Sequence, residues 1–458
     1  MQATGKRIKA SLKAIFVPLL LLGAASHVPM AMAQSPGTFT ATGDMTTPRY
    51  RHTTTLLADG TVLIVGGAPE EAFGVVVLSS AELYDPRTAT FQATGDMTTP
   101  RAGHTATLLP DGRVLIAGGV SGALGVYTGS LASAELYDPA TKTLTPTGDM
   151  TMGRWGHAAA LLLSGRVLIV GGYTKGKDTD PTRISAELYD PSAGTFTPTG
   201  NMAEPAGGAL EATLLASGKV LITGNQFVQL IQDEIYDPST GTFSLTGKPS
   251  ACCESTAALL MNGNVLVAYG PSSRLLDMPS GIVLRALAIT ELYDPASGIF
   301  TAIENMMTDY RTGHTATLLS DGNVLLAGGC DCESAGGIPF FADAEIYDPA
   351  KGTFGSTGSM QANRFGHTAT LLNDGRVLIA GGLSFVGSIL PNGYSGRTDT
   401  LSSAELYTPA VLAGPPVLLS LSGDGKGPGA ILHAGRIWLF RRATLPVLEK
   451  LWRFTSPA

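Results

Sequence analysis

The chain has 458 residues, a formal net charge of −7 and 57 glycines. The negative charge argues against nucleic acid as a partner, because a nucleic-acid-binding surface needs clustered Lys and Arg. With only 15% charged residues and so many glycines, the composition suits a close-packed all-β protein with many turns.

Residues 1–33 have the features of a signal peptide. Basic residues up to Lys13 precede an apolar run, and Ala31 and Ala33 place small residues at the two positions that a signal peptidase recognises. We expect cleavage after Ala33, and therefore a secreted, periplasmic or cell-surface protein without membrane insertion. An uncleaved anchor is the alternative, although the apolar run is short for a membrane-spanning helix.

The tripeptide Tyr-Asp-Pro, once as Tyr-Thr-Pro, recurs along the chain and ends segments such as SAELYDP. The tyrosines are Tyr84, Tyr137, Tyr189, Tyr236, Tyr293, Tyr347 and Tyr407. A period near 50 residues made of short β-like segments is typical of a propeller, in which each repeat forms one four-stranded blade. The sequence therefore predicts an all-β fold, a seven-bladed β-propeller.

Residues 101–150 show the four predicted strands of one blade. The apolar segments HTATLL and RVLIAGG flank Asp111-Gly112, a dipeptide typical of tight hairpins, and predict strands A and B. Strand C is SAELYDP, which ends at Pro139 because Pro cannot donate to a sheet. Strand D is TLTPT, which follows directly.

Strand D also occurs once before the first strand A. This copy spans residues 37–45, whereas the last repeat ends at Pro409 without a strand D. We therefore predict that the N-terminal strand completes the last blade and removes an open sheet edge. The propeller would span residues 34–410.

Arg and His recur ahead of strand A, and Glu recurs in strand C. A unique catalytic site would not need so many copies, so we interpret these residues as structural. A buried Glu needs a partner, and Arg is suited to that role. The set comprises Arg101, His104, Glu135, Arg154, His157, Glu187, Arg311, His314, Glu345, Arg364, His367 and Glu405, with a less regular copy at Arg49 and His52.

Blades 4 and 5 lack the Arg and His. The segments that lead into and include their strand A read EPAGGALEATLL and KPSACCESTAALL. A functional groove and ordinary repeat decay both explain this break.

All four cysteines lie near the break. Cys252 and Cys253 precede strand A of blade 5, whereas Cys330 and Cys332 follow strand B of blade 6. In an oxidising compartment an even number suggests disulfides, and two of the three connectivities link blade 5 to blade 6. The third needs a strained vicinal bridge. A four-thiolate metal site is the alternative, although the spacings CC and CDC are not the usual CxxC pairs.

These repeats resemble the kelch repeat. A Gly-Gly pair after strand B, the Tyr of strand C and an aromatic residue in strand D occur in kelch order over residues 36–410. Two features depart from kelch repeats: Phe or Leu144 stands where many have Trp, and blades 4 and 5 lack Gly-Gly. The sequence is most similar to bacterial extracellular kelch proteins and to the propeller of galactose-oxidase-like enzymes, which implies a kelch-type propeller.

The loops indicate where function lies. The A–B turns are uniform, whereas the B–C loops vary in length and composition and share a face with the D–A connections. Because loops carry recognition on a rigid scaffold, this B–C face is the predicted binding face, with simple space filling as the alternative. We expect a monomeric, non-enzymatic propeller without a cofactor that binds an unidentified protein or glycan.

The resemblance implies an alternative, a copper-radical carbohydrate oxidase or an inactive relic of one. Galactose-oxidase-like enzymes hold copper with a Tyr-His pair, a second His from a following domain and a Tyr cross-linked to Cys. Here Arg51 separates Tyr50 from His52, and the only His beyond the propeller is His433. Because a nucleophile elbow, HExxH and a phosphate-binding loop are also missing, we assign no catalytic or metal-binding residue.

Residues 411–458 change in character. Residues 415–435 resemble the beginning of a small C-terminal domain of unknown function found on some bacterial exported β-propellers, whereas the residues after Gly435 are rich in arginine and tryptophan. One hypothesis is a frameshift between Gly435 and Ala443 that leaves a truncated, disordered domain. A genuine short tail is the alternative.

Overall fold

The computed structural model describes residues 37–69, 76–122, 129–174, 181–205, 210–224, 232–250, 255–278, 281–303, 311–331, 340–390, 393–410, 417–420, 429–433 and 436–440. The chain divides into two compact units, Met1–Gln34 and Ser35–Ala458. The predicted signal peptide lies outside the described residues. Within the described part of the chain, no helix is long and apolar enough to cross a membrane.

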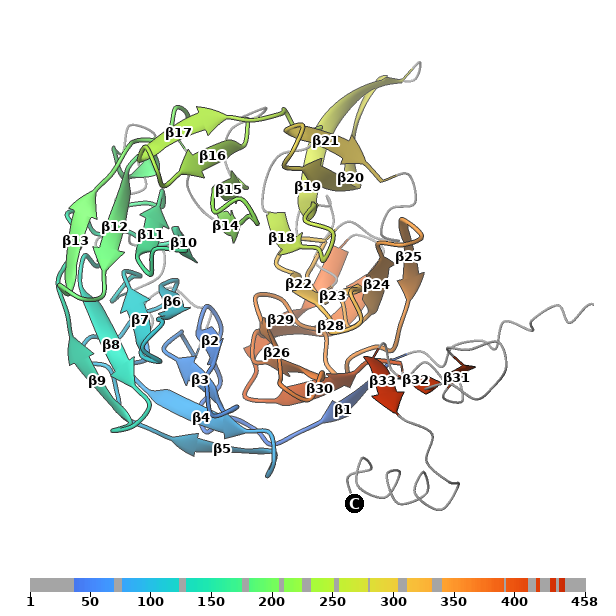
Figure 1. Ribbon diagram of the computed structural model, residues 1–458, viewed down its shortest axis with the longest axis horizontal. Coiled ribbons are helices and arrows are strands. Elements are labelled where there is room, and N and C mark those ends of the chain that lie inside the picture. Colours follow the sequence, from blue (N-terminus) through green and yellow to red (C-terminus); the bar gives the residue numbers. More distant parts are fainter. Residues whose placement is uncertain are drawn as a thin grey trace, which may run out of the picture. The chain divides into compact units, whose positions relative to one another are not determined.

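Seven four-stranded antiparallel sheets are arranged in a ring (Figure 1), which confirms the predicted seven-bladed propeller. The A strands are β2 (Thr53–Leu56), β6 (Thr105–Leu108), β10 (Ala158–Leu161), β14 (Glu211–Leu214), β18 (Ser255–Leu259), β22 (Thr315–Leu318) and β26 (Thr368–Leu371). The B strands are β3 (Val62–Val65), β7 (Val114–Ala117), β11 (Val167–Val170), β15 (Val220–Thr223), β19 (Val265–Met278), β23 (Val324–Ala327) and β27 (Val377–Ala380).

The C strands are β4 (Ala81–Asp85), β8 (Ala134–Asp138), β12 (Ala186–Asp190), β16 (Glu234–Asp237), β20 (Gly281–Asp294), β24 (Ala344–Asp348) and β30 (Ala404–Thr408). The D strands are β5 (Thr90–Ala93), β9 (Thr143–Pro146), β13 (Thr195–Pro198), β17 (Thr242–Leu245), β21 (Ile299–Ala302), β25 (Thr353–Ser356) and, in blade 7, β1 (Thr38–Ala41).

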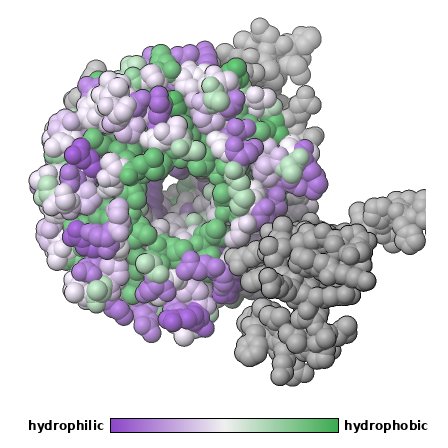
Figure 2. Space-filling model, viewed as in Figure 1, coloured by the Kyte–Doolittle hydropathy of each residue, from purple (hydrophilic) through white to green (hydrophobic). Residues whose placement is uncertain are grey.

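The core lies between neighbouring blades. The B strand of blade 1 is buried at all four positions, because it reads VLIV and has a blade on either side. One cluster joins Leu57 and Val65 of blade 1 to Val114 and Tyr137 of blade 2. Consecutive A strands contact each other around the whole ring, including β2 with β26. Figure 2 shows a central opening on one face, with apolar residues around it and mainly hydrophilic residues outside.

The N-terminal strand closes the ring as predicted. Strand β1 pairs antiparallel with β30 of blade 7, with Thr38 opposite Thr408 and Phe39 opposite Tyr407. The rings of Phe39 and Tyr407 lie 4.9 Å apart, close to the 4.8 Å between Tyr189 and Phe196 in blade 3. This pairing of β1 with β30, which we call the clasp, therefore reproduces the packing of a continuous blade.

A tyrosine–threonine hydrogen bond links the outer strands of neighbouring blades. The hydroxyl of Tyr189 lies 2.9 Å from Oγ1 of Thr147, which follows strand D of the preceding blade. The same bond occurs at Tyr84, Tyr137, Tyr236, Tyr293 and Tyr407. Blade 6 differs because Ile303 stands in place of the threonine, and the buried hydroxyl of Tyr347 has no hydrogen-bond partner among the described residues.

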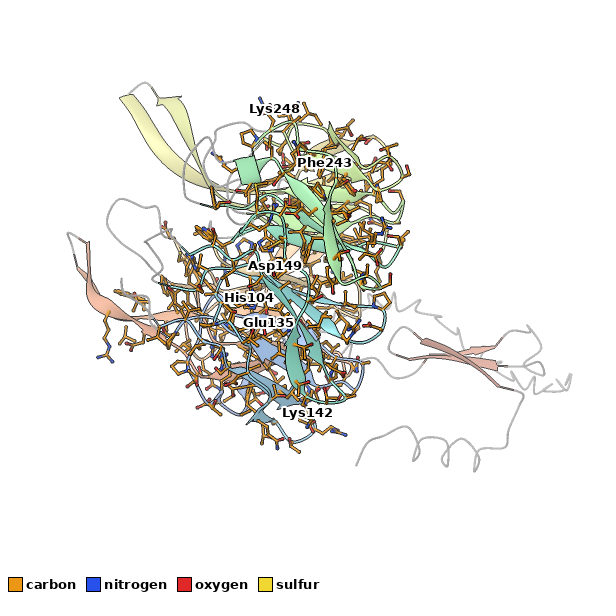
Figure 3. The ribbon with its side chains drawn as sticks, turned by 90° about the vertical axis from the view of Figure 1, so that its left-hand side faces the viewer. His104, Glu135, Lys142, Asp149, Phe243 and Lys248 are labelled. Carbon is orange, nitrogen blue, oxygen red and sulfur yellow. The ribbon has the colours of Figure 1, made fainter. Side chains whose placement is uncertain are left out.

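Two long hairpins extend the B–C connections. Strands β19 and β20 are each 14 residues long, and blade 7 carries an additional hairpin of β28 (Leu383–Leu390) and β29 (Gly393–Thr400). Figure 3 shows both hairpins projecting to the same side of the sheets. Beyond the propeller, β31 (Val417–Ser420), β32 (Gly429–His433) and β33 (Arg436–Phe440) form a separate antiparallel sheet, and the frameshift hypothesis stays a prediction.

Deleting residues 37–45 should expose the edge of β30, so the protein should aggregate or lose its single cooperative unfolding transition. Thermal unfolding followed by circular dichroism measures this. A matched control is truncation after Ala410, which leaves all seven sheets complete and should keep one transition. Unchanged unfolding of the N-terminal deletion would contradict the clasp.

Two Tyr→Phe variants should have different effects on the free energy of unfolding. Tyr189→Phe removes a hydrogen bond and should lower the free energy of unfolding by about 1 kcal/mol. Tyr347→Phe removes a buried hydroxyl that lacks this bond, so stability should stay the same or rise. Urea unfolding at equilibrium measures both variants, and an equal loss in the two would show that the hydrogen bond contributes nothing.

Candidate functional site

A buried ion pair fixes the segment that enters a blade on the B–C face. In blade 3, Nη2 of Arg154 lies 2.8 Å from Oε1 of Glu187, and both side chains are buried. Nη1 of Arg154 also donates to the carbonyls of Gly171 and Ser185, at 2.7 and 3.2 Å. Since Gly171 begins the B–C connection and Ser185 ends it, one guanidinium holds the D–A linker against both ends of the B–C loop.

The same arrangement recurs around the ring. The guanidiniums of Arg49, Arg101 and Arg364 lie 2.6, 2.8 and 2.9 Å from Glu82, Glu135 and Glu405, respectively. Blade 6 differs from this arrangement, because the guanidinium of Arg311 pairs with Asp343 at 2.8 Å and lies 3.9 Å from the carboxylate of Glu345. Aspartate replaces the serine that precedes the Ala-Glu of strand C in blades 1, 2, 3 and 7, and it draws the guanidinium towards itself.

The Gly-Gly pair allows neighbouring blades to approach. The amide of Gly119 in blade 2 donates to the carbonyl of Arg154 in blade 3, at 2.8 Å. A Cβ on Gly118 would lie 2.5 Å from that carbonyl oxygen, and Gly118 has a φ of +68°. Only glycine fits such an approach without strain.

The recurring histidines form a ring of bonds between A strands. Nε2 of His104 lies 2.9 Å from Oγ1 of Thr53 in the preceding blade. Equivalent pairs are Thr105 with His157, Thr256 with His314, Thr315 with His367, and Thr368 with His52. Burial lowers the pKa of His104, His157, His314 and His367 to about 3, so these imidazoles are neutral and join blades together.

Two interfaces between blades have other residues in place of this pair. Between blades 3 and 4, Ala158 takes the place of the threonine and Leu210 that of the histidine, so an apolar pair replaces a polar one. Between blades 4 and 5 the corresponding residues are Glu211 and Ser255. In blades 4 and 5, where the sequence departs from the repeat, the hydrogen bond between histidine and threonine of neighbouring A strands is therefore replaced by other contacts.

A row of polar residues crosses blade 4 beside blade 5. Glu211 pairs with Thr223 in the sheet, and Asp233 occupies the place that alanine takes before the Glu of strand C in blade 1. From blade 5, Oγ of Ser255 donates to Oγ1 of Thr223, and the hydroxyl of Tyr269 donates to Oδ2 of Asp233, both at 3.3 Å.

This row of Glu211, Thr223 and Asp233 carries two carboxyl groups that burial makes hard to ionise. Burial raises the pKa of Glu211 to about 7. It also raises that of Asp233 to about 8, with the negative charge of Glu291 adding to the shift and the bond from Tyr269 opposing it. Neither carboxyl has a salt bridge to a described residue.

In blades 4 and 5, the strand C glutamates keep backbone hydrogen bonds of the kind that the amides of Thr98 and Thr99 donate to Glu135, but they have no arginine. The carboxylate of Glu234 accepts hydrogen bonds from the amides of Ala203 and Glu204, at 3.1 and 3.0 Å. The carboxylate of Glu291 accepts from the amide and the hydroxyl of Ser250. The strand C glutamates thus keep their position in the fold without a cation.

The D–A linkers meet around the axis of the B–C face. Isolated bridges join Tyr50 to Ala68, Ala102 to Val120, Trp155 to Tyr173, Thr312 to Cys330 and Phe365 to Leu383. The next residue along each linker takes part in a backbone bond between blades: the amide of Gly103 donates to the carbonyl of Arg51, that of Gly156 to Gly103, and that of Gly366 to Gly313. We call residues 51, 103, 156, 313 and 366 together the central mouth.

One residue of the central mouth differs from the rest. Gly103, Gly156, Gly313 and Gly366 have φ between 61° and 63°, and Arg51 has a φ of 54° at the same place. Arg51 is exposed, and its guanidinium carbon lies 5.9 Å from the ring centroids of both Tyr50 and Trp155. The chain thus holds a long cationic side chain in a conformation that favours glycine.

An aromatic cluster lies beside the central mouth in blades 6, 7 and 1. Tyr50, Cys330 and Phe340 are buried together there, with Phe365 and Phe385 packed against them. Cys330 is disulfide-bonded. The other predicted disulfide residues, Cys252, Cys253 and Cys332, lie outside the described residues, so the connectivity stays a prediction.

Comparison with known proteins supports the fold. No family model matches the chain, and no curated protein sequence matches it. Among solved structures, it is similar to a fungal alcohol oxidase of the AA5 family determined in complex with copper. The TM-score is 0.60 at 17% identity, over 87% of this chain and 83% of the oxidase. At this identity the similarity shows a shared propeller fold.

Sequence reasoning missed the row in blade 4 and the role of Arg51. Both are visible when the repeats are aligned. QDEIYDP places Asp233 where SAELYDP has alanine, and RYRH places Arg51 where RAGH has glycine. It also missed the threonines, four of which directly follow a histidine in the sequence. They were hidden because each threonine bonds the histidine of the next repeat.

The row should lower stability as pH rises from about 4 to about 8. The folded carboxyls of Glu211 and Asp233 hold protons up to about pH 7 and 8, whereas the unfolded ones release them near pH 4, so the free energy of unfolding should fall as pH rises through 7 and 8. The buried histidines act oppositely below about pH 6.5, because the unfolded chain binds those protons first. Maximal stability should therefore lie near pH 6.5.

Asp233→Asn should remove roughly 2 kcal/mol, and Glu211→Gln roughly 1 kcal/mol, of the loss of stability between pH 6.5 and 9. Urea unfolding across that range measures it. Asp294→Asn is the control, because hydrogen bonds lower the pKa of that exposed carboxyl and keep its titration out of the window. An identical slope in all four proteins would contradict the assignment.

Proposed function

We propose that this protein is an exported, non-enzymatic propeller of the kelch type that recognises a protein or a glycan through its B–C face. The contrast between the two faces carries this proposal. On the opposite face, the A–B turns repeat one geometry in which Asp59, Asp111, Asp321 and Asp374 each accept the amide two residues on. The B–C connections instead differ from blade to blade and include the two long hairpins.

Exposed apolar side chains lie on the B–C connections. Val76 is 69% exposed in blade 1 and Val386 is 53% exposed on the blade 7 hairpin. Contiguous apolar patches mark interaction surfaces, whereas single exposed residues such as these are common, so they serve here as positions for mutation. Leu163 and Met261 are exposed in A–B turns, so an experiment has to examine both faces.

The proposed export rests on two features. The N-terminal segment has the pattern of a cleaved signal peptide, and Cys330 is disulfide-bonded. Structural disulfides persist in oxidising compartments. We therefore propose a secreted, periplasmic or cell-surface location.

A copper oxidase is the second candidate, because the similar fungal structure was determined with copper. The residues here do not fit a copper centre. Tyr50 is 4% exposed and faces the Arg51 cation, and Nε2 of His52 is bonded to Thr368 at 3.0 Å. Among the described residues, no three His, Cys, Asp or Glu are grouped as metal ligands. We therefore derive no oxidative step.

Replacing residues 386–397 of the blade 7 hairpin with a short Gly/Ser linker should abolish ligand capture and keep the fold. The replacement spares Leu383, which is buried, and Ser384, which donates to Asn363 at 2.7 Å. Loop shortening changes closure entropy by about 1 kcal/mol, whereas losing a few central contacts costs several. A glycan array and a pull-down measure capture, and calorimetry measures the fold.

The matched control is Leu163→Ser with Met261→Ser on the A–B turns, which should leave capture unchanged. Selective loss of capture in that control would place the binding face on the opposite side. Metal analysis and a carbohydrate-oxidation assay of the same protein test the alternative, which stoichiometric copper with turnover would establish.

Peptide mapping without reduction should find a disulfide between the segment of Cys252 and Cys253 and the segment of Cys330 and Cys332. That link closes a loop of roughly 80 residues, for which chain entropy predicts a stabilisation of about 4 kcal/mol before strain. Free thiols in the exported protein, or stoichiometric zinc, would refute the link.

A further inference from the structure

The central mouth has one side chain that the repeat does not require. Four other blades place glycine at the position of Arg51, with φ of 61° to 63°. Glycine adopts such a conformation freely, whereas a residue with a Cβ is strained there. Ala89 and Lys142 also have positive φ at C–D turns where other blades have glycine, so what distinguishes Arg51 is an exposed cation at the central mouth.

The cation of Arg51 has no carboxylate partner among the described residues. Other exposed arginines do: Arg87, Arg113 and Arg376 each pair with an aspartate two residues before them, at 2.6 to 2.8 Å. The corresponding neighbour of Arg51 is Arg49, whose guanidinium is committed to Glu82. Within the part of the chain that the structure describes, the guanidinium of Arg51 is thus not committed to a carboxylate.

An aromatic surface lies next to this cation. The ring of Trp155 approaches Gly103, where an added Cβ would lie 3.9 Å from Cε3. Trp155 is partly exposed and packs against Tyr173 at 5.4 Å between centroids. Trp155 and Arg51, from blades 3 and 1, therefore lie together across blade 2.

We propose that Arg51 and Trp155 form a subsite for a sugar unit that carries a carboxylate, such as a terminal uronic acid. A guanidinium binds a carboxylate through two parallel hydrogen bonds, and an aromatic ring offers a flat apolar surface to the C–H face of a sugar. Because Arg51 is one cation on a chain with a net charge of −7, a single carboxylate suits this place better than a densely charged polymer.

This inference rests on the proposed function, since it names the ligand class of the B–C face. It also places the site at the axis, where the mouth occurs once per propeller although the blades repeat. One ligand unit should therefore bind per chain.

Calorimetric titration with a glucuronic-acid-terminated or galacturonic-acid-terminated trisaccharide tests the subsite. Arg51→Gly restores the residue that four blades already have, so it should fold with an equal or higher unfolding midpoint. We expect at least a tenfold loss of affinity in Arg51→Gly, a smaller loss in Arg51→Lys, and at least a tenfold loss in Trp155→Ala. Arg87→Gly, at a C–D turn, is the control and should bind as the wild type does.

The probes include the same trisaccharides with the carboxyl reduced to an alcohol, which should bind at least tenfold more weakly. Unchanged uronate binding by Arg51→Gly would overturn the inference, and so would tighter binding of an acidic tetrapeptide than of the uronate. If the wild type binds no uronate but captures another ligand that the blade 7 replacement abolishes, the subsite is wrong and the proposed function stands. If neither occurs, both are wrong.

Discussion

In five of the seven blades, the buried guanidinium of the D–A linker holds three distant parts of the chain in register. Arg154 bonds to the first residue of the B–C connection, to the last, and to Glu187 in strand C. Because Trp155 follows directly, the position of that ring at the central mouth depends on the ion pair behind it. Burying an ion pair yields little net stability, so its main contribution here is to fix one geometry.

The repeat made the fold predictable from sequence. Seven copies of one pattern define strand types and turns, so that weak local signals support each other, and the unmatched N-terminal strand D implied closure. The central mouth was not predictable in the same way. Arg51 and Trp155 come from blades 1 and 3, and their proximity depends on how the blades stack, which no local pattern encodes.

Departures from the repeat proved more informative than the repeated residues. Arg101, His104 and Glu135 have equivalents in other blades and bond to the scaffold. Arg51, Glu211 and Asp233 each replace a residue that the repeat supplies elsewhere, and each brings an ionisable group to a place where its counterparts have none. Function on a common fold resides in such local changes, so the likeness to an oxidase fixes the architecture and leaves the chemistry to these sites.

The clasp has a consequence for the order of assembly. Strand β1 is the first part of the propeller to be synthesised, yet its partner β30 lies 366 residues later, as the bond from Thr40 to Leu406 shows. Contacts so distant in sequence form late, because the intervening loop must close first. Six blades can form from contiguous chain while β1 waits unpaired. The ring can therefore close only once nearly the whole chain is available, so a chain that ends before β30 has no partner for its first strand.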